Sequence, residues 1–246
     1  MTDYLVVLAI ALLPAGGNVI GSLIAESARA PGWVVGASLH AAAGVAIAVV
    51  SIDLMPRIID GTPIGLAVLA FLAGAAFSVL LAKGVGLLRT RLRLRGSAGA
   101  WMVYMSIAAD LLSDGLMTGV GSSVSSALGL LLGASQVVAN IPGGFASVAN
   151  FRDEGVHRKK RLLIAASFAL PVFLGASIGF WLLRGVGGEI QNAALAFVVG
   201  VLLLATVEDT LPQGDEPAPP RLISTISFAG GFAFFMLLAS WLDAGS

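Results

Sequence analysis

Residues Met102 to Thr118 read MVYMSIAADLLSDGLMT, and this stretch predicts a membrane-spanning helix that carries two carboxylates. Asp110 and Asp114 are four residues apart, so a helix places both on one face. Each charge is costly in a hydrocarbon setting, so an ionisable pair there indicates a function. A bound cation or a shared proton would explain why the two lie together. The alternative is that nearby Ser and Thr hydroxyls bond the pair, which then only holds helices together.

The composition is that of a polytopic membrane protein. The chain has 246 residues, of which 57% are hydrophobic and 11% are charged, and its mean hydropathy is +0.95. Soluble domains lie outside this range. The chain has no cysteine, which excludes thiolate metal sites, and its net charge of zero gives no general attraction to nucleic acid. Its two histidines, His40 and His157, are too few for a histidine-rich centre, and we expect hydrogen-bonded or solvated roles for them.

Eight apolar runs are long enough to cross a bilayer, which takes about 20 residues each. They cover residues 4–25, 33–56, 62–88, 100–122, 124–150, 161–183, 190–212 and 222–242. The connections are too short for a soluble domain. The sequence therefore predicts a single all-α transmembrane domain over residues 1–246, a multi-pass protein of a bacterial-type inner or plasma membrane.

The basic residues predict the orientation of this domain, because loops rich in Lys and Arg stay cytoplasmic. With the loops after the first, third, fifth and seventh helices inside, 12 of the 14 basic residues lie at the inner side. They are Arg29, Lys83, Arg89, Arg91, Arg93, Arg95, Arg152, Arg158, Lys159, Lys160, Arg161 and Arg221. Only Arg57 and Arg184 then lie outside, so both termini are expected on the extracytoplasmic side.

An internal repeat relates the first three helices to the last three. GVAIAVVSIDLMP at Gly44–Pro56 matches GVLLLATVEDTLP at Gly200–Pro212, at an offset of 156 residues. The other matches are FLAGAAFSVLLA at Phe71–Ala82 with FAGGFAFFMLLA at Phe228–Ala239, and GNVIG at Gly17–Gly21 with GASIG at Gly175–Gly179. The copies, 1–88 and 161–243, are displaced by five spans, an odd number, so they have opposite orientation. Inverted repeats are typical of secondary transporters, in which two bundles rock around a midplane site.

The central helix pair, 100–150, lies outside the repeat and is where we expect the site. Gln136 and Asn140 share a face of the second helix of this pair, and Pro142 frees a backbone carbonyl about one turn earlier. Together with Asp110 and Asp114 they form an all-oxygen ligand set, which suits hard or borderline divalent cations. Interhelical hydrogen bonding is the other interpretation of the two amides.

Three further carboxylates stand near predicted helix ends. Asp53 and Asp209 occupy equivalent repeat positions, each three residues before a proline, and Glu208 precedes Asp209. They are candidate entrance and exit carboxylates for a cation. The alternative is that each is an interfacial side chain, hydrated at the headgroups or bonded in a turn.

The order of these motifs resembles the ZIP family, the Zrt/Irt-like zinc and iron permeases. DLLSDG at Asp110–Gly115 stands where that family has an HNxPEG-type motif, and ANIPGG at Ala139–Gly144 stands where it has HExPEG. EDTLPQ at Glu208–Gln213 follows in the position of a DExxPE-like run. The resemblance covers nearly the whole chain. It implies eight helices in a 3+2+3 arrangement, both termini outside and a divalent metal cation as the transported substrate.

The ligands at these motifs differ from those of the family. Asp110 replaces the first-motif histidine and Asp114 its glutamate, while Ala139 and Gly143 replace the second-motif histidine and glutamate. The family's two-metal site is thus reduced to one oxygen-lined site, formed by Asp110, Asp114 and Asn140 with help from Gln136. Loss of imidazole ligands argues against a preference for zinc over oxygen-preferring ions.

The leading hypothesis is therefore a ZIP-like transporter of a divalent cation such as zinc, iron or manganese, working by alternating access. It is not an enzyme, needs no cofactor and partners only the cation and the lipid bilayer. A non-transporting membrane sensor or partner protein with the same fold is one alternative, and a proton-linked carrier of another solute is the other. The sequence leaves the oligomeric state open, a homodimer included.

Overall fold

The structure, a computed structural model, describes residues 2–91, 98–216 and 219–244, and all its regular elements are helices. Arg93 and Arg95, two of the predicted cytoplasmic charges, lie outside the described residues. In chain order the elements are α1 (Thr2–Ser27), α2 (Gly32–Ala48), η1 (Val49–Leu54), α3 (Met55–Gly61), α4 (Ile64–Arg91), α5 (Ala98–Val124), α6 (Ser126–Asp153), α7 (Arg158–Ser167), α8 (Ala169–Leu183), α9 (Gly188–Ala205), η2 (Thr206–Thr210), α10 (Leu211–Asp215) and α11 (Arg221–Ala244).

These elements form eight long rods, because α2, η1 and α3 are continuous, as are α9, η2 and α10, and only Phe168 separates α7 from α8. Within the described chain, seven rods are long and apolar enough to cross a membrane. The eighth, α5, has 27 residues and carries Asp110 and Asp114, and it is not among those seven. The chain is thus an all-helical, multi-pass membrane protein.

The second and seventh rods continue through prolines at which the sequence predicted them to end. Pro56 and Pro212 each follow a π-helical turn, η1 and η2, and the helix then runs on to Gly61 and Asp215. A proline inside an α-helix clashes with the carbonyl four residues earlier. The wider π turn, in which the Met55 N–H bonds the Val50 carbonyl, relieves that clash and lets the helix pass.

The outer surface of the bundle is apolar. Leu69, Leu80 and Leu237 are each about two-thirds or more exposed, and they lie on α4 and α11, the rods least buried by their neighbours. An apolar surface of this extent suits lipid and not water.

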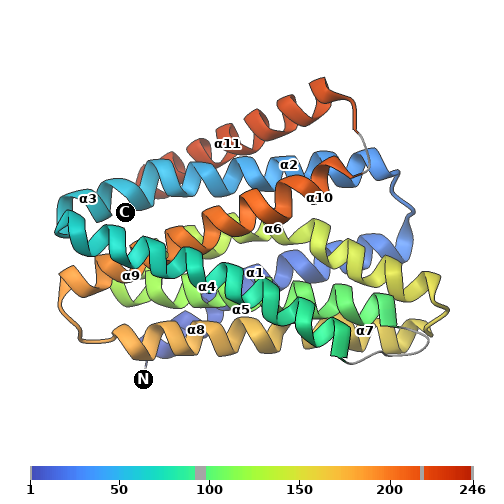
Figure 1. The fold of residues 1–246 in the computed structure, drawn as a ribbon, viewed down its shortest axis with the longest axis horizontal. Helices are drawn as coiled ribbons and strands as arrows, with labels where there is room; N and C mark the ends of the chain where they lie inside the picture. The colour runs from blue at the N-terminus through green and yellow to red at the C-terminus, as the bar shows by residue number, and fades with distance from the viewer. Residues whose placement is uncertain (1, 92–97, 217–218, 245–246) are drawn as a thin grey trace.

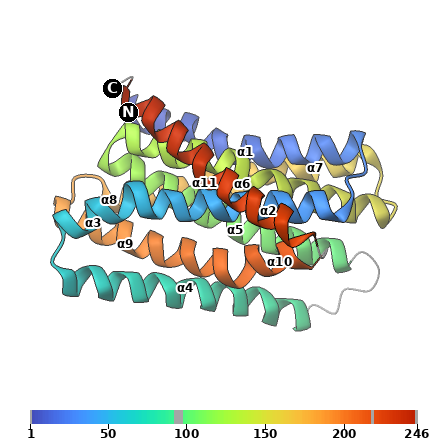
Figure 2. The same ribbon diagram turned by 90° about the horizontal axis from the view of Figure 1, so that it is seen from above.

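The rods pack as two groups. One group holds α1, α5, α6 and the α7–α8 rod, and the other holds the α2–α3 rod, α4, the α9–α10 rod and α11. Figure 2 shows α4 at the edge of the bundle beside α9, with α11 crossing over α2. The two groups meet mainly where α2 contacts α6 and α9 contacts α5. A site between the groups therefore draws mainly on α2, α5, α6 and the α9–α10 rod, with α4 alongside.

Two close helix crossings, of α2 with α11 and of α9 with α4, involve matching positions of the sequence repeat. A Cβ added to Gly44 of α2 would lie 2.0 Å from the Phe228 carbonyl oxygen of α11, and one added to Gly200 of α9 would lie 2.2 Å from that of Phe71 in α4. Only glycine allows such close approach of two helices. Both crossings use residues that the sequence places at equivalent positions.

The bundle has two distinct ends. Figure 1 shows that α1 begins and α11 ends at the same end, together with the α3–α4 and α8–α9 connections. The α1–α2 and α6–α7 connections lie at the other end. Arg29, Arg152 and Arg158 lie in or beside these two connections, and we call this the basic end.

Candidate functional site

A cavity of about 1000 Å³ lies between the two groups of rods. Its floor includes Met117 of α5 and Gln136 of α6, and it extends to Asn150 and Glu216 at the basic end. Toward the opposite end the space is filled by the largest buried apolar cluster, which includes Val49, Leu132 and Leu195. The cavity therefore reaches one end of the bundle and is closed toward the other.

Asp110 and Asp114 both line this cavity, on the face of α5 predicted from their spacing. Asp110 is exposed to the cavity, and Asp114 is half-buried. The amide nitrogen of Asn140 donates a hydrogen bond of 2.9 Å to the Asp114 carboxylate and lies 3.4 Å from the Pro14 carbonyl oxygen. Asn140 thus fixes one carboxylate oxygen of Asp114 and leaves Asp110 facing open space.

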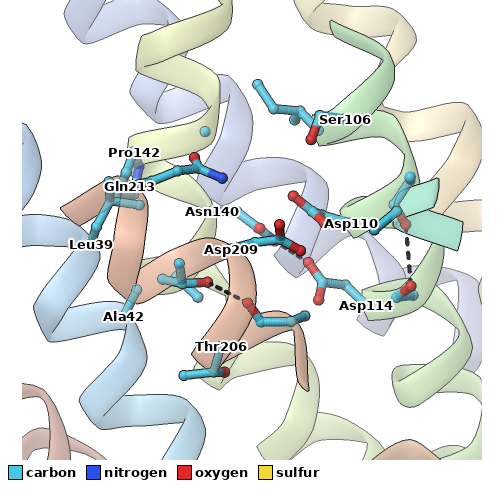
Figure 3. Close-up of a pocket in the computed structure, with 18 of the residues that line it drawn as sticks. Leu39, Ala42, Ser106, Asp110, Asp114, Asn140, Pro142, Thr206, Asp209 and Gln213 are labelled. Atoms are coloured by element: carbon cyan, nitrogen blue, oxygen red, sulfur yellow. Dashed lines mark hydrogen bonds between the residues drawn. The ribbon is translucent and has the colours of Figure 1, made fainter. Parts of the chain in front are cut away.

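Asp209 joins this pair from the other group of rods. It lies in η2, lines the same cavity and is half-buried. Figure 3 shows its carboxylate pointing toward those of Asp110 and Asp114. The structure therefore brings together three carboxylates that are separated by up to 99 residues in the sequence.

The other predicted carboxylates lie elsewhere. Glu208 is exposed and is absent from the cavity lining. Asp53 also lies off the cavity, in η1, where one carboxylate oxygen is 3.2 Å from the Arg57 guanidinium. Of the three candidate entrance and exit carboxylates, Asp209 alone faces the cavity.

Gln136 lines the floor of the cavity and is buried. Its amide nitrogen lies 3.9 Å from the Met117 sulfur, a weak acceptor. No hydrogen bond joins Gln136 to either carboxylate in the described structure. Its amide oxygen is therefore not committed to the Asp110 and Asp114 pair.

The Ser and Thr hydroxyls near the pair bond the backbone and not the carboxylates. Ser113 donates to the Ala109 carbonyl, and Thr118 donates to the backbone carbonyl of Asp114. In the described part of the chain, neither of these hydroxyls donates a hydrogen bond to an aspartate side chain, so they do not satisfy the two carboxylates. Ser113 lines the cavity, and because its proton bonds the backbone, its oxygen could act toward the cavity only as an acceptor.

The cavity carries negative charge only. Asp110, Asp114, Asp209 and Glu216 line it, and no Lys, Arg or His does so among the residues that the structure describes. His40 lies outside it, with its ring nitrogens 2.9 Å from the Gly36 carbonyl oxygen and 3.2 Å from the Asp215 carboxylate. Over the described ranges, no three His, Cys, Asp or Glu side chains come close enough together to hold a metal ion by themselves. A cation here would need amide, hydroxyl or water oxygens as well.

Comparison with known proteins adds nothing to this geometry: no family model matches the chain, and no curated protein matches it significantly.

Proposed function

We propose that the protein moves a divalent metal cation across a membrane by alternating access, in the manner of the ZIP family that its motifs resemble. The charge of the cavity is the observation that carries this proposal. Four carboxylates line one internal space, and no described cationic side chain lines it to neutralise them. A cleft with low-dielectric walls and one sign of charge concentrates counter-ions. A doubly charged cation offsets two of these carboxylates.

Asp110 and Asp114 would hold the cation, with Asn140 positioning Asp114 and Gln136 supplying an amide oxygen from the cavity floor. Asp209 faces the pair from η2 and would meet the cation on its way to the basic end. The set contains only oxygen ligands, which favours hard or borderline ions such as manganese or iron(II) over soft ones. Water completes the coordination, because the carboxylates alone are too few.

An inverted 3+2+3 repeat would supply the two alternating states. The crossings of Gly44 with Phe228 and of Gly200 with Phe71 support it, since both use repeat-equivalent residues. The π turns before Pro56 and Pro212 support it as well. With the basic end in the cytoplasm, both termini are extracytoplasmic, and the described conformation is open inward.

Metal uptake by the full-length protein in proteoliposomes tests the proposal. Zn, Mn, Fe, Co and Cd are offered separately, and Asp110→Asn and Asp114→Asn are compared with the wild type. Glu208→Gln is the matched control, because Glu208 is an exposed carboxylate that does not line the cavity. We expect uptake of at least one metal, a loss of at least about tenfold in each Asp variant, and no loss in the control.

Three other results would point elsewhere. If no metal is bound or moved, transport of a divalent cation is wrong. If both Asp variants behave as the wild type in binding and function, the non-transporting sensor is favoured. Solute movement that follows a pH gradient without any metal would favour a proton-linked carrier.

A further inference from the structure

Asn18 is a fully buried amide on α1 that has no hydrogen-bond partner in the described structure. Its residue exposure is 0%, and both its amide nitrogen and its amide oxygen are without a partner. An amide left unpaired in an apolar interior costs about 1–3 kcal/mol by mutational data. Buried polar groups are nearly always paired, so an exception calls for an explanation such as a water, an ion or a functional role.

The amide lies directly behind the cavity wall. A Cβ added to Gly143 would stand 3.8 Å from the Asn18 amide nitrogen and 3.7 Å from a methyl carbon of Ile107. Gly143 and Ile107 both line the cavity. Gly143 is one helical turn after Asn140, and Ile107 is one turn before Asp110. Asn18 thus lies behind the cavity wall at the level where α5, which carries Asp110 and Asp114, faces α6, which carries Asn140.

Gly143 leaves an open space at that point. Nothing outside its own helix comes within 3.7 Å of the added Cβ, which is ordinary van der Waals distance. Its neighbour Gly144 differs, because a Cβ there would lie 1.9 Å from the Asn18 carbonyl oxygen. Gly144 is therefore required for helix packing, whereas the absence of a side chain at Gly143 leaves the Asn18 amide next to the cavity.

The other half of the molecule shows that packing does not require an amide here. The repeat pairs GNVIG with GASIG, so Asn18 corresponds to Ala176 of α8. Ala176 is also 0% exposed, and its carbonyl oxygen lies 2.2 Å from a Cβ added to Gly119 of α5. The crossing at Asn18 has the same form, with Gly144 of α6 in place of Gly119. Alanine fills the equivalent space, so the polar amide serves another purpose.

We infer that Asn18 is a further cation-binding residue on a third helix. Its amide nitrogen lies on the Gly143 side, but neither amide atom has a partner, so the amide can turn without loss of a hydrogen bond and present its oxygen when a divalent cation settles between α5 and α6. The inference rests on the proposed function and deepens it by adding a ligand. Hard divalent cations take six or more oxygens, and Asp110, Asp114 and Asn140 supply only part of such a shell. The amide nitrogen of Asn140 is already directed at Asp114, so a second amide next to the same space is chemically useful.

Calorimetric titration of the purified full-length protein with Mn²⁺ tests this role. The variants are Asn18→Ala, which copies the alanine of the other half, and Asn18→Asp, which keeps the shape and adds charge. Ser122→Ala is the control, because the Ser122 hydroxyl is also buried without a partner but lies off the cavity. We expect Asn18→Ala to fold and to bind Mn²⁺ about 10- to 100-fold more weakly, Asn18→Asp to bind at least as tightly as the wild type, and the control to be unchanged.

The failures of the two proposals are distinguishable. A wild type that binds and transports no divalent metal overturns the proposed function, and the inference falls with it. A wild type that binds Mn²⁺ while Asn18→Ala binds equally well overturns only the inference. If Asn18→Ala does not fold, Asn18→Asp decides: a clear loss of Mn²⁺ affinity in that variant contradicts a ligand role.

Discussion

The two π-helical turns in the described part of the chain, η1 and η2, stand at positions that match in the sequence repeat, but their aspartates have different surroundings. In η1, Asp53 is 3.2 Å from Arg57, one turn further along the same rod. In η2, Asp209 faces the cavity, and the residue one turn further along is Gln213. Arg57 and Gln213 stand at matching positions of the repeat. Arg57 pairs with Asp53, whereas Gln213 carries no charge, and Asp209 faces the cavity. A π turn thus lies toward the end where the space between the rods is filled, at η1, and another lies toward the end that the cavity reaches, at η2.

Two further ion pairs, one at each end of the bundle, also differ in how far they are exposed to water. At the basic end, two of the three guanidinium nitrogens of Arg161, Nε and Nη2, donate to the Glu26 carboxylate of α1 at 2.5 and 2.7 Å. At the opposite end, Arg184 and Asp3 are 3.9 Å apart. The offset of 158 residues pairs Glu26 with Arg184 and Asp3 with Arg161, so the charges are exchanged between the halves. The Glu26 side chain is 6% exposed and that of Asp3 is 74% exposed, so only the first pair is shielded from water.

The largest effect is expected from Gln213→Arg, which gives η2 the partner that η1 already has. An arginine there would reach Asp209 and place a positive charge at the cavity wall. Two unit charges about 4 Å apart interact by about 4 kcal/mol at an effective dielectric constant near 20. We therefore expect the Mn²⁺ affinity, measured by calorimetry, to fall at least about 100-fold.

Gln213→Met is the control for that experiment, because it keeps the length of the side chain and adds no charge. It should bind Mn²⁺ as the wild type does. Equal binding by Gln213→Arg would mean that Asp209 does not contribute to the cation site, and the contrast between the two π turns would lose its functional meaning.

The sequence predicted the helices well, because each needs about 20 apolar residues, and that signal is local. Asp110 and Asp114 were predicted on one face for the same reason, since helical periodicity fixes it. The continuation of two rods through Pro56 and Pro212 was missed. A π turn depends on how neighbouring helices hold the backbone, and the apolar pattern carries no trace of it.

The full set of cavity residues could not be predicted from local sequence patterns either. Asp209 was predicted as an exit carboxylate, but its approach to Asp110 depends on how η2 packs against α5. Asn18 was missed altogether, although the GNVIG and GASIG motifs already differed there by an amide against a methyl group. A polar residue in one copy of a buried repeat, with an apolar residue in the other, is the sequence signal that would have found it.

Glu26→Gln is expected to have the next largest effect, on stability. Removing one partner of a buried ion pair leaves an uncompensated charge, which typically costs about 3–5 kcal/mol. Arg161 would keep its bond to the Val156 carbonyl but lose the carboxylate. Thermal unfolding in detergent should therefore show a clearly lower Tm. Asp3→Asn, which removes the exposed counterpart, should leave Tm nearly unchanged, and equal shifts in the two variants would contradict the contrast in burial.

Arg57→Gln is expected to have the smallest effect, and it makes η1 resemble η2. The Arg57 side chain is 45% exposed, but that of Asp53 is only 12% exposed, so water screens the pair in part and loss of the partner should cost about 1–3 kcal/mol, at about 2–4 °C in Tm for each kcal/mol. Because Asp53 lies off the cavity, calorimetry should find the wild-type Mn²⁺ affinity. A large loss of Mn²⁺ binding would contradict this, since it would mean that the η1 region also contributes to the proposed cation site. Unchanged binding in Arg57→Gln, together with a loss of binding in Gln213→Arg, would show that η2 and not η1 contributes to the proposed cation site.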